Sequence, residues 1–433
     1  MKVLVIGSGA REHALAVGVS YDPSVDEVHV APGNPGMEAV ATRHDVKAED
    51  PASVVDLARS LGADLVIVGP EAPLVAGVAD ALGEAGIACF GPSAAAAKLE
   101  ASKAFAKDVM HSASVPTARS VVCTDLDTVA VALDELGSPY VVKYDGLAAG
   151  KGVVVTEDRD EALAHAADCL DKPDGRVVLE EYLDGPEVSL FCVTDGKTVV
   201  PLQAAQDFKR VGEGDSGPNT GGMGAYTPLD WAPTDLSQWV VDNVAGPTVD
   251  EMARRGTPFA GLLYVGLALT SKGVKVVEFN ARFGDPETQV VLAALKTPLG
   301  QLLKAAATGT LADFEALDWY EGSLVTVVVA SENYPATPVT GDEIVGLDTI
   351  TAEDNAHVLH AGTATGPDGK LVSSGGRVLS VIGWGDDLAE ARDRAYKAID
   401  KINLRGSHFR TDIALKAEQG QLELSDAYNK GTV

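Results

Sequence analysis

Short apolar runs alternate with longer stretches of helical periodicity in the first part of the chain. The apolar runs occupy residues 3–6, 28–31, 65–68 and 87–90, and helical spacing occupies residues 51–61 and 74–85. This alternation is typical of βαβ units, in which helices cover both faces of a parallel sheet. We therefore predict a doubly wound parallel sheet over residues 1–103. Ligands bind such sheets beyond the carboxyl ends of the strands, and glycine-bearing loops follow those ends here.

The rest of the pattern predicts a multidomain protein of the α/β and α+β classes. A long helix is expected over residues 94–112, and a compact unit of strands and two helices (127–136, 159–170) over residues 125–188. Further strands are expected at 188–193, 262–270, 274–279, 324–330 and 377–382, followed by an amphipathic helix at 388–402. The expected domains are an N-terminal α/β domain (1–103), a core (104–124 and 189–322), an inserted unit (125–188) and a C-terminal α/β domain (323–433).

The composition is that of a folded, acidic protein. Hydrophobic residues make up 46% of the 433 and charged residues 22%, which excludes a disordered chain. Lys plus Arg number 34 against 63 Asp plus Glu, and the net charge of −29 argues against nucleic-acid and anionic-membrane partners. The four cysteines have no C-x-x-C spacing, which indicates neither a zinc site nor a redox motif, and their scarcity fits the cytoplasm. No uncharged apolar stretch is long enough to span a membrane.

The first glycine-rich turn begins like a dinucleotide-binding fingerprint but departs from it. Glu12 stands at the third glycine position after Gly7 and Gly9, and no acidic residue follows the second predicted strand. NAD is therefore disfavoured. The turn is either a tight strand–helix connection or an anion site at a helix N-terminus, reinforced by Arg11.

A second glycine-rich segment, residues 146–152, lies between two predicted strands. It has three residues between its glycines and Gly152 after Lys151, so it does not match the Walker pattern, and a helix does not follow it. It is either an exposed hairpin or a flap whose backbone approaches phosphate oxygens. The two flanking lysines, Lys143 and Lys151, favour phosphate.

The stretch from Lys275 to Arg282 gives the strongest chemical signal. Residues two apart share one face of a strand, so Glu278, Asn280 and Arg282 should lie together. Carboxylate and amide oxygens suit Mg²⁺, and an arginine can hold a carboxylate or a transferring phosphoryl group. The alternative, a solvated edge strand, is disfavoured by the polar turn that follows at 283–289.

The long loop around residues 206–224 is rich in glycine. It is either a surface loop or a loop that closes on a ligand. The eight histidines form no ligand cluster, and His13 is interpreted as a hydrogen-bonding residue rather than a base.

Together these segments resemble the phosphoribosylamine–glycine ligases, also called glycinamide ribonucleotide synthetases, of the ATP-grasp superfamily. The resemblance covers nearly the whole chain, to about Asp412, and rests on residues 7–13, 145–152, 219–224 and 282–287. It implies an ATP-grasp core interrupted by a mobile lid at 125–188. It also implies the second step of purine biosynthesis, in which ATP joins glycine to 5-phosphoribosylamine through glycyl phosphate, with Mg²⁺ or Mn²⁺. We expect a cytoplasmic monomer with small-molecule substrates.

The resemblance implies roles residue by residue. ATP phosphates would contact Lys103 and Lys143 under a flap containing Gly146, Gly150, Lys151 and Gly152. Glu180, Glu181, Tyr182 and Leu183 would form the adenine-reading hinge, with Glu187 near the ribose. Glu278 and Asn280 would bind the metal, and Arg282 and Lys143 would be catalytic. Glycine or 5-phosphoribosylamine would contact Gly9, Arg11, Glu12, His13, Gly69, Pro70, Glu71, Asp207, Arg282, Gly284, Asp285, Pro286, Glu287 and Arg377. Tyr144 replaces the family's usual small residue, so we expect altered packing under the flap.

Three rival functions stay open at this point. Another ATP-grasp ligase would join a different carboxylate and amine, or would carboxylate its substrate. A non-catalytic nucleotide sensor is disfavoured because Glu278, Asn280, Arg282 and the lysines are all present. An NAD oxidoreductase is weakened by Glu12.

Overall fold

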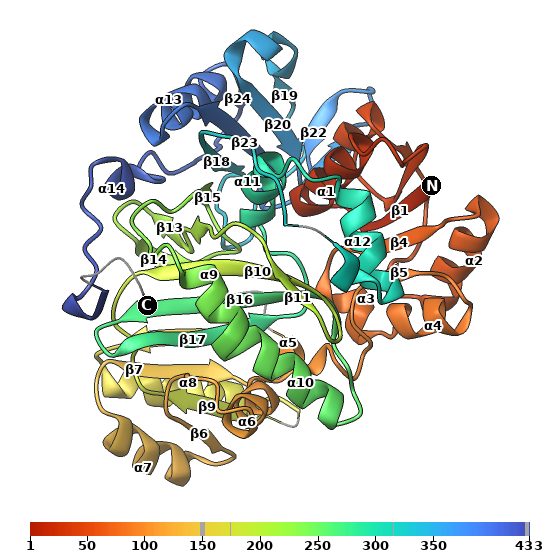
Figure 1. The fold of residues 1–433 in the computed structure, drawn as a ribbon. Coiled ribbons are helices and arrows are strands. Elements are labelled where there is room, and N and C mark those ends of the chain that lie inside the picture. The colour runs from red at the N-terminus through yellow and green to blue at the C-terminus, as the bar shows by residue number, and fades with distance from the viewer. Residues whose placement is uncertain (148–151, 174, 315, 429–432) are drawn as a thin grey trace.

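The computed structural model describes residues 1–433 except 148–151, 174, 315 and 429–432 (Figure 1). Its N-terminal part is a parallel five-stranded sheet in the order β3-β2-β1-β4-β5. The strands are β1 (Lys2–Gly7), β2 (Glu27–Pro32), β3 (Thr42–Arg43), β4 (Leu65–Val68) and β5 (Cys89–Phe90). The buried apolar runs predicted from the sequence form this sheet.

Two predicted helices of this region are interrupted in the structure. The pattern at 74–85 forms α3 (Glu71–Val75) and α4 (Val78–Glu84), because Gly77 has a φ of 89°. The pattern at 94–112 forms α5 (Lys98–Ala101) and α6 (Lys103–Ser112), because Ser102 is extended and its Oγ accepts from the backbone N–H of Phe105 at 3.1 Å. Helices α1 (Ala10–Ser20) and α2 (Pro51–Leu61) are continuous.

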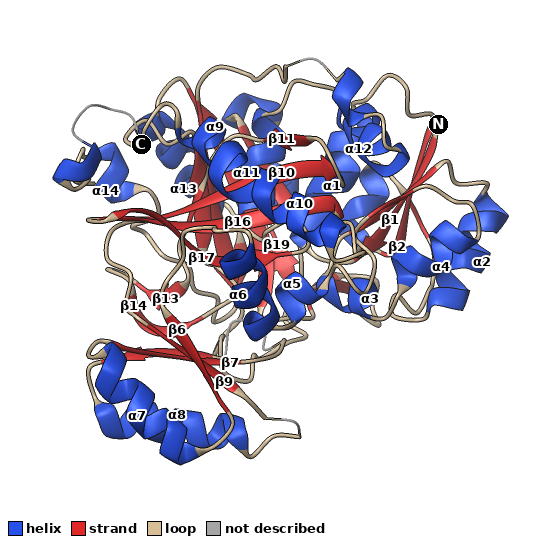
Figure 2. Cartoon of the chain, turned by 60° about the horizontal axis from the view of Figure 1, so that its bottom comes forward, coloured by secondary structure: helices blue, strands red, loops and turns tan. Residues whose placement is uncertain are grey.

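The inserted unit is an antiparallel sheet in the order β6-β9-β7-β8, with two helices on its outer face (Figure 2). Its elements are β6 (Ser120–Cys123), α7 (Leu126–Leu136), β7 (Tyr140–Tyr144), β8 (Val153–Thr156), α8 (Arg159–Leu170) and β9 (Val177–Glu180). Residues 104–124 were expected in the core, but β6, within this range, pairs with β9 of the inserted unit. We therefore propose that the lid begins at β6. The lid also has its own hydrophobic cluster, separate from the clusters that unite the other regions.

The core sheet has the order β11-β10-β16-β17 and is antiparallel. Its strands are β10 (Glu187–Asp195), β11 (Val199–Pro201), β16 (Ala260–Thr270) and β17 (Gly273–Asn280). The nearby helices are α9 (Leu236–Val240), α10 (Gly246–Arg254), α11 (Glu287–Ala294) and α12 (Leu299–Thr308).

A third large sheet joins the core region to the C-terminal region, in the order β12-β15-β18-β23-β20. Its strands are β12 (Gln206–Asp207), β15 (Gly224–Thr227), β18 (Ser323–Ala330), β20 (Ala356–His360) and β23 (Arg377–Gly385). Helix α13 (Leu388–Ile399) packs on β23 and β18 and ends three residues before the predicted limit. Three small ladders complete the fold: β13 (Arg210–Gly212) with β14 (Ser216–Asn219), β19 (Ile344–Val345) with β24 (Asn403–Leu404), and β21 (Thr363–Thr365) with β22 (Leu371–Ser373).

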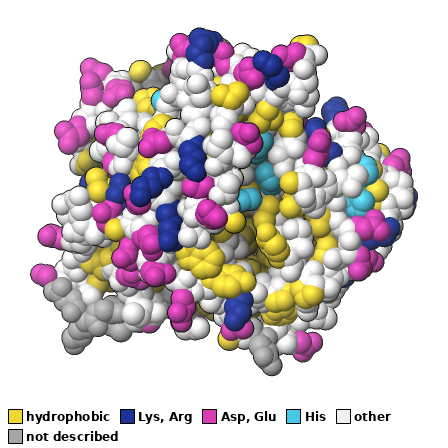
Figure 3. Space-filling model, turned by 90° about the horizontal axis from the view of Figure 1, so that it is seen from above, with side chains coloured by type: hydrophobic (Ala, Val, Ile, Leu, Met, Phe, Trp, Pro, Cys, Tyr) yellow, Lys and Arg dark blue, Asp and Glu magenta, His cyan; other side chains and the backbone are white. Residues whose placement is uncertain are grey.

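The surface agrees with the acidic composition. On the face shown in Figure 3, basic side chains lie scattered among acidic ones, and histidines lie beside a hydrophobic strip in a hollow. Among the described residues, no helix combines the length and the hydropathy that a membrane crossing needs.

Candidate active site

One large cavity of about 1160 Å³ brings most of the predicted site residues together. Lid, core, N-terminal and C-terminal residues all contribute to its wall. The predicted residues that line it are Arg11, Glu71, Lys103, Lys143, Gly146, Gly152, Glu180, Glu181, Tyr182, Leu183, Glu187, Asp207, Glu278, Asn280, Arg282, Gly284, Asp285, Glu287 and Arg377. The predicted residues that do not line it are Gly9, Glu12, His13, Gly69, Pro70 and Pro286. Gly150 and Lys151 lie outside the described residues.

Buried lysines meet a single glutamate at the lid end of the cavity. Glu180, at the end of β9, is 3.0 Å from Lys143 Nζ through Oε2 and 3.2 Å from Lys107 Nζ through Oε1. Lys107 also donates to Thr117 Oγ1 at 2.9 Å. Lys103 stands one helical turn before Lys107 on α6 and donates to the Gly146 carbonyl at 3.2 Å. This lysine cluster, Lys103, Lys107 and Lys143, has more positive charge than Glu180 neutralises.

Burial and repulsion from Lys143 shift the pKa values of Lys103 and Lys107 downward. Burial lowers the pKa of Lys107 to about 8, with Lys143 adding repulsion and Glu180 opposing the shift. Burial also lowers the pKa of Lys103, although the nearby Glu278 carboxylate opposes this. Such a site favours an incoming polyanion, because negative charge relieves the repulsion among the lysines.

Side chains at the start of α6 contact the first residues after β7. Lys143 pairs with Val153 across the ladder, which confirms two strands around the predicted flap. Asp145 Oδ1 accepts from Ser102 Oγ at 3.0 Å, so the flap is tied to the start of α6. The Tyr144 ring lies 4.0 Å from Lys172 Nζ, and a Cβ on Gly146 would come within 2.6 Å of that ring. Tyr144 therefore packs between Lys172 and Gly146, where a smaller residue would not reach both.

A salt-bridge network links the lid to the core at the predicted hinge. Glu181 lies 2.6 Å from Lys275 Nζ on β17 and 3.2 Å from Arg119 Nε at the lid entrance. Burial alone would raise the pKa of Glu181, but these hydrogen bonds outweigh it and lower the pKa to about 2. The predicted hinge therefore contains an ionised carboxylate that pairs with Arg119 at the lid entrance and with Lys275 in the core.

Glu278 and Asn280 both line the cavity, as the strand pattern predicted. Gly266 pairs with Glu278 and Leu267 with Val276, so Val277 is bulged, and its carbonyl accepts from Lys143 Nζ at 3.3 Å. Burial alone would raise the pKa of Glu278, but Lys209 and the lysine cluster lower it, which keeps the carboxylate ionised.

These two side chains fit a divalent cation that shares its ligands with a substrate. Among the described residues, no group of three or more His, Cys, Asp or Glu side chains could hold a metal ion. Mg²⁺ takes one or two protein carboxylates and completes its shell with water and substrate phosphates. One ionised carboxylate beside one amide oxygen matches that requirement.

Another part of the cavity wall, here called the arginine end, holds Arg282 between two carboxylates. Its Nη2 is 2.9 Å from Glu100 Oε1, and its Nε is 3.2 Å from Glu71 Oε2. Glu100 also accepts from the backbone N–H of Ala281 at 2.7 Å. Burial disfavours the charge of Arg282, but the two carboxylates outweigh it and raise its pKa. Burial raises the pKa of Glu100, with Glu71 adding repulsion.

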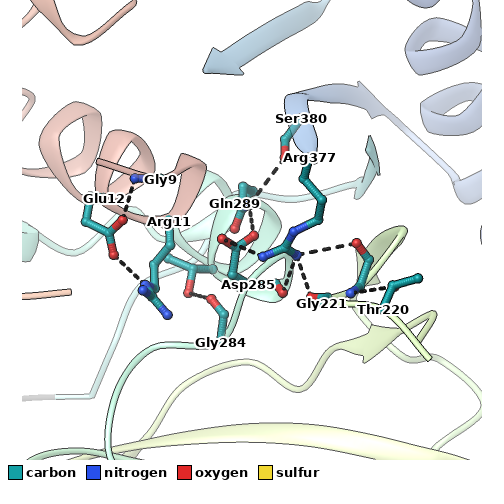
Figure 4. Close-up of polar contacts among 12 residues, drawn as sticks. Gly9, Arg11, Glu12, Thr220, Gly221, Gly284, Asp285, Gln289, Arg377 and Ser380 are labelled. Atoms are coloured by element: carbon teal, nitrogen blue, oxygen red, sulfur yellow. Dashed lines mark hydrogen bonds and ion pairs between the residues drawn. The ribbon is translucent and has the colours of Figure 1, made fainter. Parts of the chain in front are cut away.

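Arg377, from the C-terminal region, reaches the turn before α11 (Figure 4). Its Nη2 lies 3.2 Å from Asp285 Oδ2, and its Nη1 donates to the Asp285 carbonyl at 2.9 Å and to the Gly221 carbonyl. Gln289 holds the other Asp285 oxygen at 2.7 Å. Burial alone would raise the pKa of Asp285, but Arg377 and Arg11 lower it.

Asp207 and Glu287 place further carboxyl groups on the wall. Glu287 Oε1 accepts from Ser189 Oγ at 3.0 Å and from the Tyr264 hydroxyl at 2.9 Å. Burial raises the pKa of Asp207 to about 8, with Glu287 adding repulsion and Lys209 opposing the shift.

The N-terminal glycine turn is built around Glu12. Its Oε2 accepts from the Gly9 backbone N–H at 2.7 Å, and its Oε1 lies 2.5 Å from Arg11 Nε. A Cβ on Gly7 or Gly69 would come within 2.4 or 2.1 Å of the Glu12 side chain. Glu12 therefore caps α1 and packs between the loops, while Arg11 reaches the cavity.

His13 joins the N-terminal and C-terminal regions. Its Nδ1 accepts from the His360 backbone N–H at 2.9 Å. Burial lowers the pKa of His13 to about 3, with His360 and His357 adding to the shift. This neutral ring agrees with the predicted hydrogen-bonding role.

Sequence reasoning missed several residues of the cavity. Lys107 could have been found from its spacing to Lys103, because residues four apart share a helix face, whereas Glu100 lies on α5, before the break at Ser102. Lys209 lies in the glycine-rich loop around residues 206–224, but no contact was predicted for it, and its Nζ is 2.7 Å from Glu187 and 3.8 Å from Glu278. The wall also includes a group beyond the quoted motifs, without a local sequence signal: Lys416, Ala417, Gln421, Leu422 and Glu423.

Comparisons with known proteins cover almost the whole chain. Family profiles described as the N domain, the ATP-grasp (A) domain and the C domain of phosphoribosylglycinamide synthetase match residues 1–100, 101–288 and 324–416. A Streptomyces coelicolor protein named phosphoribosylamine–glycine ligase is 66% identical over 96% of this chain and 99% of that protein. The crystal structure of phosphoribosylamine–glycine ligase from Thermotoga maritima has a TM-score of 0.82 at 32% identity, covering 96% and 100% of the two chains.

A more distant structure shares the fold alone. The biotin carboxylase domain of a Hydrogenobacter thermophilus 2-oxoglutarate carboxylase, solved with MgADP, has a TM-score of 0.68 at 16% identity, covering 98% and 99% of the chains. The ATP-grasp (A) domain profile matches residues 101–288, which include the inserted unit and most of the lysine-lined cavity. The protein is therefore of the ATP-grasp class. The matches to the N and C domains, over residues 1–100 and 324–416, identify one family within this class. The chain belongs to the phosphoribosylamine–glycine ligase family, which confirms the resemblance and the predicted fold class.

Proposed function

We propose that the protein joins glycine to 5-phosphoribosylamine at the expense of ATP, giving glycinamide ribonucleotide, ADP and phosphate. This is the second step of purine biosynthesis. The observation that supports it most is the cavity of about 1160 Å³, whose wall has the lysine cluster on one part and Arg282 between carboxylates on another. A nucleotide polyanion fits the first part, and a small zwitterionic substrate fits the second.

In the first half-reaction, a carboxylate oxygen of glycine attacks the γ-phosphorus of ATP, the bond to the bridging oxygen breaks, and ADP leaves. Lys103 and Lys143 neutralise the phosphate oxygens, and Arg282 holds the anionic reacting groups in place. Such a reaction depends on positioning and electrostatic stabilisation rather than on a protein nucleophile.

In the second half-reaction, the amine of 5-phosphoribosylamine attacks the carbonyl carbon of glycyl phosphate. The amide bond forms, the carbon–oxygen bond to phosphate breaks, and the amine nitrogen loses a proton. Glycyl phosphate is easily hydrolysed, so the lid must exclude water while it persists. Glu71, Asp207 and the turn at Gly284–Glu287 are proposed to orient glycine and the amine.

Glu278 and Asn280 are proposed to hold Mg²⁺ or Mn²⁺ together with the ATP phosphates. The cation neutralises the negative charge that would otherwise separate Glu278 from the nucleotide. The chain supplies the two oxygen ligands, and Lys209 keeps the Glu278 carboxylate in place at 3.8 Å.

The test is ADP release by the purified protein with glycine and 5-phosphoribosylamine, together with mass detection of the amide product. Alanine, serine and bicarbonate replace glycine in parallel reactions. We expect ADP release to require glycine and product to require both substrates. A preference for another carboxylate would assign the protein to a different ATP-grasp reaction.

A further inference from the structure

The β13–β14 hairpin forms part of the cavity wall next to the proposed metal ligands. Phe208, Lys209, Arg210 and Asp215, in and just before this hairpin, all line the cavity. Lys209 carries the contacts to the Glu187 and Glu278 carboxylates, so the placement of the hairpin decides where its ammonium group lies.

A buried arginine from the C-terminal region contacts this hairpin at several points, and we call this set of contacts the grip. The Arg410 side chain is 1% exposed, and its Nη1 lies 2.9 Å from Asp215 Oδ1 and 3.1 Å from the Arg210 carbonyl. Its guanidinium carbon stands 5.0 Å from the centre of the Phe208 ring, within the range of a cation–π interaction. Arg410 thus contacts the hairpin at its start, its tip and the aromatic residue before it, without lining the cavity itself.

Asp412 completes the grip. Both of its oxygens bind Arg410, Oδ1 to Nε at 2.7 Å and Oδ2 to Nη2 at 2.8 Å. The same Oδ2 accepts from the Gly214 backbone N–H at 2.8 Å, at the tip of the hairpin. Only the planar fork of arginine can satisfy Asp412 and still reach Asp215, which a lysine ammonium on its flexible stem cannot do.

The grip is anchored to helix α13 of the C-terminal region. The Tyr396 hydroxyl donates to the Arg410 carbonyl at 2.8 Å, and Arg392 Nη2 donates to the Thr411 carbonyl at 3.0 Å. A continuous chain of contacts therefore runs from α13 through Arg410 to the hairpin and then through Lys209 to Glu278.

We infer that Arg410 is a positioning residue, which holds the β13–β14 hairpin so that Lys209 meets Glu187 and Glu278 at the nucleotide–metal site. The inference rests on the proposed function for its kinetic consequences. A freed hairpin moves Lys209 away from the two carboxylates, so ATP binding suffers more than glycine binding. A misplacement of about 1 Å can cost up to about a hundredfold in an active site.

The experiment compares Arg410→Lys and Asp215→Asn with the unaltered protein. Asp215 has a φ of 57°, which asparagine tolerates, and its side chain is half exposed, so Asp215→Asn tests the grip without disturbing buried packing. Arg405→Lys is the matched control, because Arg405 forms a two-pronged pair with Asp342 at 2.8 and 2.9 Å on an exposed surface. Three quantities are measured: the KM for each substrate, the Tm, and the rate of tryptic cleavage after Arg210 in the substrate-free protein.

For Arg410→Lys we expect a KM for ATP raised about tenfold, a KM for glycine changed less than twofold, and faster cleavage into fragments 1–210 and 211–433. Asp215→Asn should shift the same quantities in the same direction by less, at an unchanged Tm. Arg405→Lys should change none of them. Unchanged cleavage in both variants would overturn the inference, as would a loss of activity that follows Tm alone. Cleavage needs no substrate, so a failure of the proposed reaction in the unaltered protein is distinguishable from a failure of the grip.

Discussion

The two ends of the cavity hold their cations in opposite ways. At the lid end, Lys107 and Lys143 share Glu180, and burial with repulsion from Lys143 lowers the pKa values of Lys103 and Lys107. At the arginine end, Arg282 lies between two carboxylates, Glu71 and Glu100. One end has positive charge in excess, and the other has its guanidinium group already paired.

This difference indicates how one cavity can bind two kinds of ligand in separate positions. Repulsion among the lysines is relieved when a triphosphate arrives, so that end gains binding energy directly from the charge of the ligand. Arg282 is instead oriented in advance by its partners, which suits a group that must meet a reacting carboxylate in one geometry. The lid end therefore supplies affinity, and the arginine end supplies alignment.

The largest effect is expected where the two ends meet, at Glu278. Glu278→Ala removes the proposed carboxylate ligand and one of the negative charges that act on Lys103. We expect turnover to fall by about a thousandfold or more. ADP release at saturating substrate measures it, and Glu343→Ala, at an exposed carboxylate paired with Lys370, is the control. Turnover close to that of the unaltered protein would remove Glu278 from the metal site.

Lys143→Met tests the lid end, since methionine keeps the length of the side chain and removes its charge. Turnover should fall by about a hundredfold, because a buried cation that faces the transferring phosphate is lost. Lys370→Met, at an exposed lysine, should leave turnover unchanged. A rise in KM for ATP with a normal kcat would show that Lys143 contributes to binding alone.

Glu100→Gln tests the alignment attributed to the arginine end. Glutamine can still accept from the Ala281 N–H, but it no longer fixes the Arg282 guanidinium group by charge. We expect kcat to fall about tenfold while KM for ATP stays within about twofold. Steady-state kinetics with ATP and glycine varied separately measure this, and an unchanged kcat would mean that Glu71 alone orients Arg282.

The smallest effect is a pH dependence at Lys107. Its pKa is lowered from 10.5 to about 8, so the folded protein loses this proton before the unfolded chain does. Between these two values, the contribution of Lys107 to the free energy of unfolding increases with pH, while the charge that attracts ATP disappears. We expect KM for ATP to rise roughly threefold between pH 7.5 and 9.

Lys107→Gln is the matched variant for this pH dependence, and it should flatten the rise in KM. Chemical denaturation at both pH values measures the stability change, which should have the opposite sign to the change in affinity. A rise in KM that is equally steep in Lys107→Gln would assign the titration to another group.

The sequence predicted those parts of the fold and site that local patterns determine. The strands on either side of the flap follow from short apolar runs, and the shared wall of Glu278 and Asn280 follows from the alternation of apolar and polar residues. The break at Ser102 was missed because the apolar spacing continues through it, whereas the capping hydrogen bond to Phe105 interrupts the helix. Periodicity records which face is buried, not where the backbone changes direction.

Contacts between distant segments could not be predicted from spacing. The carboxylate of Glu12 caps α1 between Gly7 and Gly69, and the spacing of residues gave no sign that the Gly69 loop comes so close. The grip of Arg410 on Asp215 joins residues far apart in the chain, and neither residue has a local signal. The sequence indicated the chemistry where a single strand carries the residues. It did not indicate contacts that bring residues from several domains together.

The sheet that joins β12 and β15 to β18 has a consequence for synthesis of the protein. Both early strands leave the ribosome well before β18, the neighbour on which β15 pairs from Gly224 to Thr227. Until then, the backbone groups along that edge of β15 have no strand beside them, and exposed edges promote aggregation. A nonsense mutation upstream of residue 323 would make this condition permanent, so truncated chains should be cleared or precipitate rather than persist as a partial enzyme.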